Sequence, residues 1–143
     1  MLRPDDLAFL DQQRVGRLAT ADEAGSPSVV PVCFARLGQR LYVAIDAKPK
    51  SGNPRKLRRL RNISERPEAV LLVDVYEEDW RGLRWLLVRA RATILEQGQE
   101  RQAALEALER RYPQYADMGL SGLGLPVIAL EATAVSRWPA GTD

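Results

Sequence analysis

The 143-residue sequence contains no histidine and only one cysteine, Cys33. A Ser–His–Asp triad, a Cys–His nucleophile, a His–Cys zinc site and a facial iron site all need imidazole, so one chain cannot build them. We therefore predict no metal site and name no catalytic side chain. If the protein is an enzyme, a bound cofactor must supply most of its chemistry.

The sequence also lacks long apolar runs. None approaches the ~20 residues of a membrane-spanning helix, and no apolar segment preceded by positive charge stands at the N-terminus. A single cysteine excludes an intramolecular disulfide. We expect a cytoplasmic protein that does not engage a membrane, and the length fits one domain covering residues 1–143.

Acidic residues are absent from the stretch KPKSGNPRKLRRLRNI at 48–63, which contains seven Lys or Arg. The whole chain has 21 Lys plus Arg and 19 Asp plus Glu, so the remainder has 14 cations against 19 anions. Nucleic-acid-binding domains usually carry a broad basic face instead. A mildly acidic body with one compact basic segment suits a small polyanion, and nucleic acid is not favoured.

The hydrophobic periodicity predicts a mainly β domain with a few helices. Strands are expected at 14–21, 27–37, 40–46, 68–76, 83–96 and 126–138, and helices at 4–13, 54–66 and 98–112. The first three strands follow one another through short turns, which favours an antiparallel meander. We predict a small barrel of six antiparallel strands whose interior is filled by side chains alone.

The basic segment is predicted to begin irregularly and to continue as a helix. Asn53 suits the N-cap of this helix, and Pro54 suits its first position. Apolar residues recur every third position and predict a buried stripe of Leu57, Leu60 and Ile63. The cations expected on the opposite side are Arg55, Arg58 and Arg59.

Two readings of these cations are open. In the first, Lys48, Lys50 and Arg55 converge on the helix N-terminus, where free N–H groups already favour a phosphate or carboxylate. In the second, they are a solvated helix face and a polar loop.

For Cys33, within an apolar strand, a small buried hydrophobe is the simplest interpretation. Tryptophans such as Trp85 are explained by packing, although one could also cover the flat ring of a cofactor.

Four short motifs follow one another along the chain. They are L-A-T at 18–20, G-x-P at 25–27, R-N-I…P at 61–67 and E-D-W at 78–80, and the final strand reads PVIALEA…W. Their order and spacing, from about residue 7 to residue 138, resemble the pyridoxamine 5'-phosphate oxidase-like split β-barrel family. Within that family the pattern is most similar to the branch that uses the deazaflavin coenzyme F420.

The resemblance implies a six-stranded antiparallel split β-barrel of the FMN-binding type and a homodimer with the cofactor at the subunit interface. The ring would rest on the second and third strands, and cations near the inserted helix would hold the phosphate. Carried onto this sequence, the implied cofactor-binding residues are Pro31, Val32, Cys33, Asp46, Lys48, Lys50, Lys56, Arg59 and Trp85. We add Arg55 from its position beside the helix start. The sequence departs from the family pattern at GNP, residues 52–54.

The expected function is that of an F420-dependent oxidoreductase, which transfers a hydride between the deazaflavin and a small conjugated substrate. FMN offers one phosphate, whereas F420 has a phosphodiester, a lactyl carboxylate and an oligoglutamate tail, which seven cations match better. An FMN-dependent oxidase or reductase of the same fold is one alternative. A non-enzymatic barrel that stores a cofactor or binds nucleic acid is another, and the lack of aromatic residues at 48–63 for base stacking disfavours nucleic acid.

Overall fold

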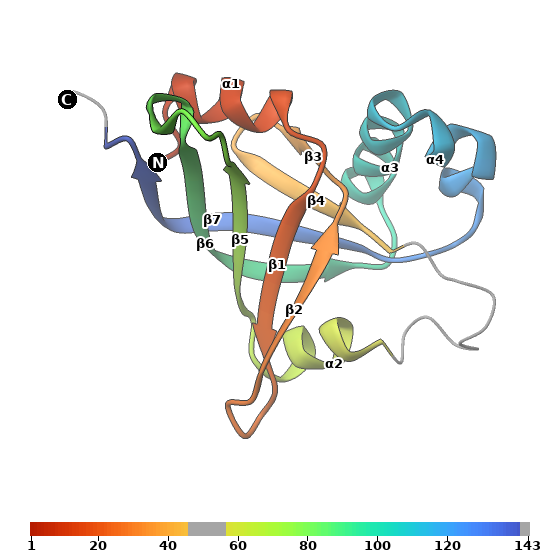
Figure 1. Ribbon diagram of the computed structural model, residues 1–143. Helices are drawn as coiled ribbons and strands as arrows, with labels where there is room; N and C mark the ends of the chain where they lie inside the picture. The colour runs from red at the N-terminus through yellow and green to blue at the C-terminus, as the bar shows by residue number, and fades with distance from the viewer. Residues whose placement is uncertain (46–56, 141–143) are drawn as a thin grey trace.

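The computed structural model describes residues 1–45 and 57–140. Their strands form an antiparallel sheet that curls into a half-barrel, in the order β2-β1-β5-β6-β7-β4-β3 (Figure 1). The strands are β1 Gly16–Ala21, β2 Pro27–Val32, β3 Phe34–Leu37, β4 Arg40–Ala44, β5 Glu68–Val75, β6 Arg84–Leu95 and β7 Val127–Trp138. The predicted mainly β, antiparallel, barrel-type fold is confirmed.

The segment 27–37, predicted as one strand, forms two strands, so the sheet has seven strands rather than six. β2 pairs with β1 and β3 pairs with β4, and these two consecutive strands lie at opposite edges of the sheet. The chain turns at Cys33 to pass from one edge to the other. The prediction of one continuous strand is wrong because no glycine marks this turn in the sequence VPVCF.

Alternation along the strands decides which side chains fill the barrel. In β6, Leu86, Val88 and Ala90 are buried, whereas Trp85 and Arg89, at alternate positions, are exposed on the outer face. Equivalent residues of the other strands meet these side chains in one apolar cluster. The interior of the half-barrel is therefore packed with side chains, as predicted.

Two helices close opposite ends of this core (Figure 1). Helix α1, Pro4–Gln12, inserts Phe9 and Leu10, and helix α2, Arg58–Glu65, inserts Leu60 and Ile63. The predicted N-terminal helix is confirmed to within a residue. Both helices are short, so tertiary packing of these apolar side chains, rather than helix propensity, accounts for their stability.

Helix α2 is shorter than the helix predicted at 54–66. It begins at Arg58 after the cap residue Leu57, which is consequently only partly buried. Asn53 and Pro54, the predicted N-cap and first helical residue, lie outside the described residues. The helix ends at Glu65, as expected ahead of Pro67.

A second apolar cluster lies on the outer face of β3, β4 and the first half of β7. It is covered by α3 Gln99–Arg111, by α4 Pro113–Met118 and by the 3-10 helix η4 Leu120–Gly122. A further 3-10 helix, η3 Trp80–Gly82, connects β5 to β6.

The predicted helix at 98–112 is confirmed as α3. Helix α4 was not predicted, although Pro113 in its first turn and Gly119 after its end are the usual signals of a helix start and end. None of the helices in residues 1–45 and 57–140 has the length and apolar character needed to cross a membrane.

Candidate functional site

Four residues predicted to bind the cofactor line one small cavity. Pro31 and Val32 end β2, Cys33 occupies the turn to β3, and Arg59 lies in the first turn of α2. The cavity, which we call the Cys33 cavity, has a volume of about 130 Å³ and is completed by Val15, Ala44 and Tyr115. Because β3 and β4 separate the two segments in sequence, only the fold brings Arg59 to the turn.

Helix α2 is held against the barrel by apolar and polar contacts. Leu60 and Ile63 enter the core, and the buried Asn62 donates a hydrogen bond from Nδ2 to Oγ1 of Thr20 in β1 at 3.0 Å. A buried amide needs such a partner, so this bond fixes the rotation of the helix about its axis. The half-buried Arg59 side chain is thereby directed to the Cys33 cavity.

The other arginines of α2 have a different environment. Arg58 and Arg61 are exposed and line a separate hollow with Asp22 and Glu65. We predicted Arg58 and Arg59 on the same side of the helix, and the structure corrects this. Arg58 and Arg59 point in different directions because neighbouring residues of a helix are rotated by about 100°. The buried side of the helix also includes Asn62, which sets the rotation that separates the two arginines.

The turn at Cys33 is held by Tyr112, which follows the last residue of α3. The backbone N–H of Phe34 donates to the Tyr112 hydroxyl at 3.1 Å, and that hydroxyl lies 2.8 Å from the Phe34 carbonyl and 2.9 Å from the Arg14 carbonyl. It has one proton and therefore donates to one carbonyl at a time. Burial raises the pKa of Tyr112, so the hydroxyl stays protonated at neutral pH. Sequence reasoning did not identify this contact.

The chemistry of the Cys33 cavity is that of a binding wall. The described residues of its lining include no Asp or Glu, and among them Arg59 supplies the charge. A guanidinium forms strong, directional hydrogen bonds with phosphate or carboxylate groups. Val15, Val32 and Ala44 supply apolar surface against which a flat ring can pack. This donor set fits one edge of a ring-bearing, anionic cofactor.

Five predicted site residues lie outside the described residues. They are Asp46, Lys48, Lys50, Arg55 and Lys56. Their assignment to the cofactor stays a prediction.

Trp85, the remaining predicted residue, does not line the Cys33 cavity. It is the second residue of β6, stands opposite Trp138 of β7 in the strand register, and is 37% exposed on the outer face. Within one chain, the structure therefore separates Trp85 from the other four residues.

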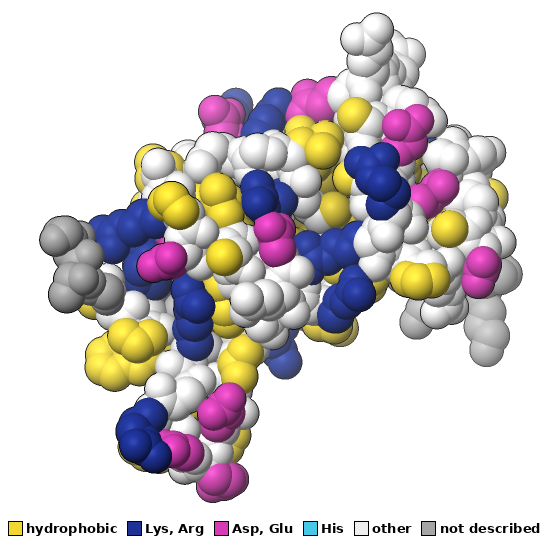
Figure 2. All heavy atoms as spheres, turned by 90° about the horizontal axis from the view of Figure 1, so that it is seen from above, with side chains coloured by type: hydrophobic (Ala, Val, Ile, Leu, Met, Phe, Trp, Pro, Cys, Tyr) yellow, Lys and Arg dark blue, Asp and Glu magenta, His cyan; other side chains and the backbone are white. Residues whose placement is uncertain are grey.

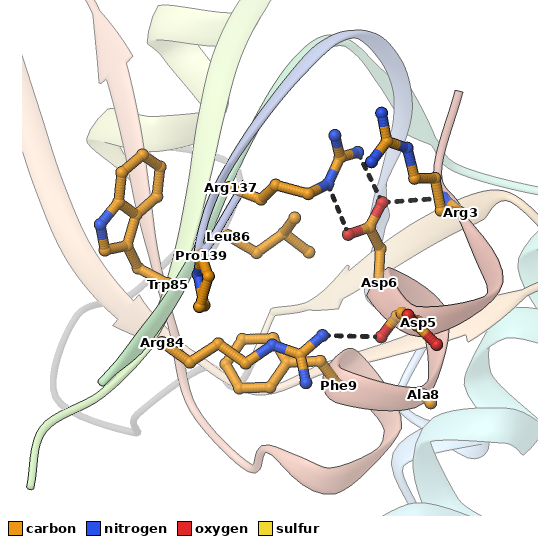
Figure 3. Close-up of a pocket in the computed structure, with 10 residues that line it drawn as sticks. All are labelled: Arg3, Asp5, Asp6, Ala8, Phe9, Arg84, Trp85, Leu86, Arg137 and Pro139. Carbon is orange, nitrogen blue, oxygen red and sulfur yellow. Dashed lines mark hydrogen bonds and ion pairs between the residues drawn. The ribbon is translucent and has the colours of Figure 1, made fainter. Parts of the chain in front are cut away.

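A larger cavity, of about 550 Å³, lies between α1 and the ends of β6 and β7, and we call it the α1 cavity (Figure 3). It is lined by Arg3, Asp5, Asp6, Ala8, Phe9, Arg84, Trp85, Leu86, Arg137 and Pro139. The Trp85 ring points away from it, on the other side of the strand (Figure 3). Sequence reasoning did not identify this cavity.

A buried ion pair forms one wall of the α1 cavity (Figure 3). Nε and Nη2 of Arg137 donate to the two carboxylate oxygens of Asp6 at 2.8 and 2.7 Å, and the backbone N–H of Arg3 donates to the same carboxylate at 2.8 Å. Asp6 is only 2% exposed. Burial opposes its ionisation, but the hydrogen bonds from Arg137 and Arg3 outweigh burial and lower the pKa of Asp6.

The alternation of inward- and outward-facing residues along β6 and β7 indicates this cavity. Arg84 is two residues from the buried Leu86, and Arg137 is two residues from the partly buried Val135, so both arginines occupy inward-facing positions. A charged residue on the core face of a strand requires a partner. The acidic first turn of α1 supplies that partner, Asp6, to Arg137.

Comparisons with known proteins agree with this architecture. A family model described as pyridoxamine 5'-phosphate oxidase matches residues 2–138. No curated protein matches the chain.

Similar solved structures include three with different descriptions. The conserved hypothetical protein Rv2991 from Mycobacterium tuberculosis has 18% sequence identity and a TM-score of 0.77, over 96% of this chain and 84% of that chain. The heme storage protein HutZ from Vibrio cholerae has 21% identity and a TM-score of 0.72, over 94% and 93%. An F420 reductase has 24% identity and a TM-score of 0.63, over 90% and 94%. Likenesses at these identities establish the fold alone.

Proposed function

Because the chain belongs to the pyridoxamine 5'-phosphate oxidase family, we propose that it is an oxidoreductase that uses a flavin-type cofactor, specifically the deazaflavin F420, to reduce or oxidise a small conjugated substrate. The observation that carries the proposal is the Cys33 cavity. It joins Pro31, Val32 and Cys33 to Arg59 of the basic helix, four residues that the family resemblance implies at one cofactor site.

The preference for F420 over FMN rests on charge. The stretch 48–63 contains seven Lys or Arg and no acid, and within it Arg58 and Arg61 are exposed beyond the cavity-lining Arg59. One phosphate needs few of these cations, whereas a tail with several carboxylates can engage more of them. The fold shared with an F420 reductase is compatible with this choice.

In the proposed reaction the side chains bind and orient the cofactor and substrate. The bound deazaflavin would supply hydride transfer. Pro31, Val32 and the backbone at Cys33 would hold its ring, and Arg59 would pair with one of its anionic groups. Substrate would be oriented against the ring with water excluded, and backbone N–H groups and cations would stabilise developing negative charge.

The size of the Cys33 cavity supports a homodimer. Small-molecule sites usually measure ~300–1,000 Å³, so a cavity of about 130 Å³ covers only part of a three-ring cofactor. The described residues therefore supply only one wall of such a site. We propose that a second copy of the chain supplies the other wall, as the family resemblance implies.

The outer face of the sheet is the surface we assign to this dimer. Pro31 lies on it at the edge of the Cys33 cavity, and the same face exposes Val29, Trp85 and Trp138, which are 65%, 37% and 52% exposed. No helix in the described residues packs on this region of β1, β2, β5 and β6. If Trp85 contacts a cofactor, it does so across the interface, in the site of the other copy.

Haem binding is a second candidate because HutZ is described as a heme storage protein. Haem iron is held by His, Cys, Met or Tyr, and this chain has no histidine. Cys33, in the Cys33 cavity, is the thiol available as a ligand. A hemin Soret shift that Cys33→Ser abolishes would favour this candidate over F420.

Titration with F420 and, separately, with FMN tests the proposed cofactor, with the fluorescence of each followed to saturation. We expect a Kd for F420 that is lower by about tenfold or more. Binding should weaken as salt is raised, because exposed charges are screened over ~10 Å at 0.1 M. Equal affinities or a preference for FMN would overturn the F420 assignment. Binding to DNA or RNA with steep salt dependence, and to neither cofactor, would favour the non-enzymatic barrel.

A further inference from the structure

We propose that the α1 cavity is a second binding site, which takes a small organic monocarboxylate. Among the described residues it shares no lining residue with the Cys33 cavity, so the proposal does not depend on the cofactor. The cavity volume of about 550 Å³ lies within the range of small-molecule sites.

The cations of the α1 cavity are not equivalent. The guanidinium of Arg137 is engaged with Asp6 through Nε and Nη2. Arg84, by contrast, pairs with no carboxylate anywhere in residues 1–45 and 57–140, and its Nη2 donates only to the backbone carbonyl of Asp5, at 3.0 Å. Arg84 therefore has N–H donors to offer to a ligand.

The Arg84 guanidinium is also held in position. Its Cζ lies 4.4 Å from the centroid of the Phe9 ring, a cation–π contact, and the hydrogen bond to Asp5 fixes its end (Figure 3). A side chain restrained in this way loses little further entropy when it binds an anion. The two contacts thus hold a fork of N–H donors at the wall of a cavity.

Charge balance selects a monoanion. Among the described residues of the lining, three arginines face two aspartates, so these residues carry an excess of one positive charge. A dianionic phosphate would exceed this charge and would also meet the carboxylates of Asp5 and Asp6. A carboxylate matches both the charge and the fork of a guanidinium, which binds it through two parallel hydrogen bonds.

The apolar part of the lining indicates the rest of the ligand. Ala8, Phe9, Leu86 and Pro139 surround the charged groups, so a hydrocarbon or aromatic body can pack beside a carboxylate that pairs with Arg84. On the face of the molecule seen from the α1 end, basic side chains lie among acidic and hydrophobic ones (Figure 2). Such a mixed surface does not attract polyanions in general, which leaves recognition to the cavity.

Benzoate is a suitable probe, and benzamide is its neutral counterpart of nearly the same shape. We would titrate the full chain with each and follow backbone amide signals by two-dimensional NMR. We expect saturable shifts at Arg84, Leu86 and Arg137 with benzoate, and affinity weaker by roughly tenfold or more with benzamide. Equal affinities for the two probes, or no saturable shift at these residues, would overturn the proposal.

Variants of one arginine at each end of the molecule complete the test. Arg84→Gln should weaken benzoate binding by roughly tenfold. Arg61→Gln removes the same charge from the exposed face of α2, at the other end of the barrel (Figure 1), and should change affinity less than about twofold. An equal loss in both variants would mean general electrostatics and refute the site. If Arg84→Gln does not fold, Arg84→Lys decides: it retains charge without the fork, and unchanged benzoate affinity would refute the proposed pairing.

Discussion

The buried pair of Asp6 and Arg137 should contribute strongly to the stability of the fold. Asp6→Ala removes the acceptor of three hydrogen bonds, from Arg137 Nε, Arg137 Nη2 and the Arg3 N–H, at 2.7–2.8 Å. Breaking a buried pair costs ~3–5 kcal/mol. The Arg137 side chain keeps 18% exposure, so water can partly solvate it. We therefore expect a loss near the lower limit, about 3 kcal/mol, in the free energy of unfolding measured with urea.

A double-mutant cycle distinguishes the ion pair from the packing around it. Replacing both residues, as Asp6→Leu with Arg137→Met, avoids leaving a charge in an apolar site, so it should cost less than the sum of the two single changes by roughly 1–3 kcal/mol. Strictly additive losses would refute the coupling. A loss below about 0.5 kcal/mol for Asp6→Ala alone would refute the burial argument altogether.

The same pair gives the stability a pH dependence of known sign. The pKa of Asp6 is lowered in the folded protein from its ordinary value of 3.8. Its contribution is therefore fully present well above pH 3.8 and is lost as the pH falls below that value toward the folded pKa. Asp6→Asn cannot titrate, so its free energy of unfolding should fall less steeply with acid than that of the unmodified chain. Identical slopes would contradict the assignment.

Three further predictions concern other parts of the molecule. Arg59→Ala should weaken F420 binding by roughly 1–3 kcal/mol, while Arg66→Ala, at the exposed C-cap of the same helix, should change it by less than about 0.5 kcal/mol, and equal losses would show that Arg59 is misassigned. Trp138→Glu should convert a dimer detected by light scattering to monomer and weaken cofactor binding with it, whereas a tight-binding monomer would refute the interface. Burial and the hydrogen bond to Glu100 raise the pKa of Tyr42 to about 12. Tyr42 should therefore stabilise the fold below pH ~10 and lose that contribution as the pH rises toward 12. Tyr42→Phe should abolish this alkaline loss of stability, measured by urea titration.

The sequence is sufficient for most of the fold because its strands alternate clearly. In β6, Leu86, Val88 and Ala90 identify the buried face, and α3 is identified by the helical spacing of Leu105 and Leu108. The position of the turn at Cys33 is not predictable in this way. It is fixed by the hydroxyl of Tyr112, a contact between segments that are far apart in sequence.

The candidate sites differ in how far the sequence reveals them. Pro31, Val32 and Cys33 were implied by family resemblance, and periodicity alone gives no reason to join them to Arg59. For the α1 cavity the reverse holds. No sequence motif marks it, but strand alternation places Arg84 and Arg137 at inward-facing positions. The cavity itself cannot be predicted from these positions alone, because it depends on the pairing of β6 with β7 and on the packing of α1 over both strands.

The turn at Cys33 also protects the protein from aggregation through the edges of its sheet. Edge strands expose unpaired N–H and C=O groups, which can recruit strands from other chains and begin aggregation. Here the two edges, β2 and β3, are six and four residues long and belong to one continuous segment that changes direction between them. β2 also contains Pro27 and Pro31, which have no N–H to donate. A foreign strand therefore finds only short, angled edges, one of them interrupted by proline, and no straight template on which to extend.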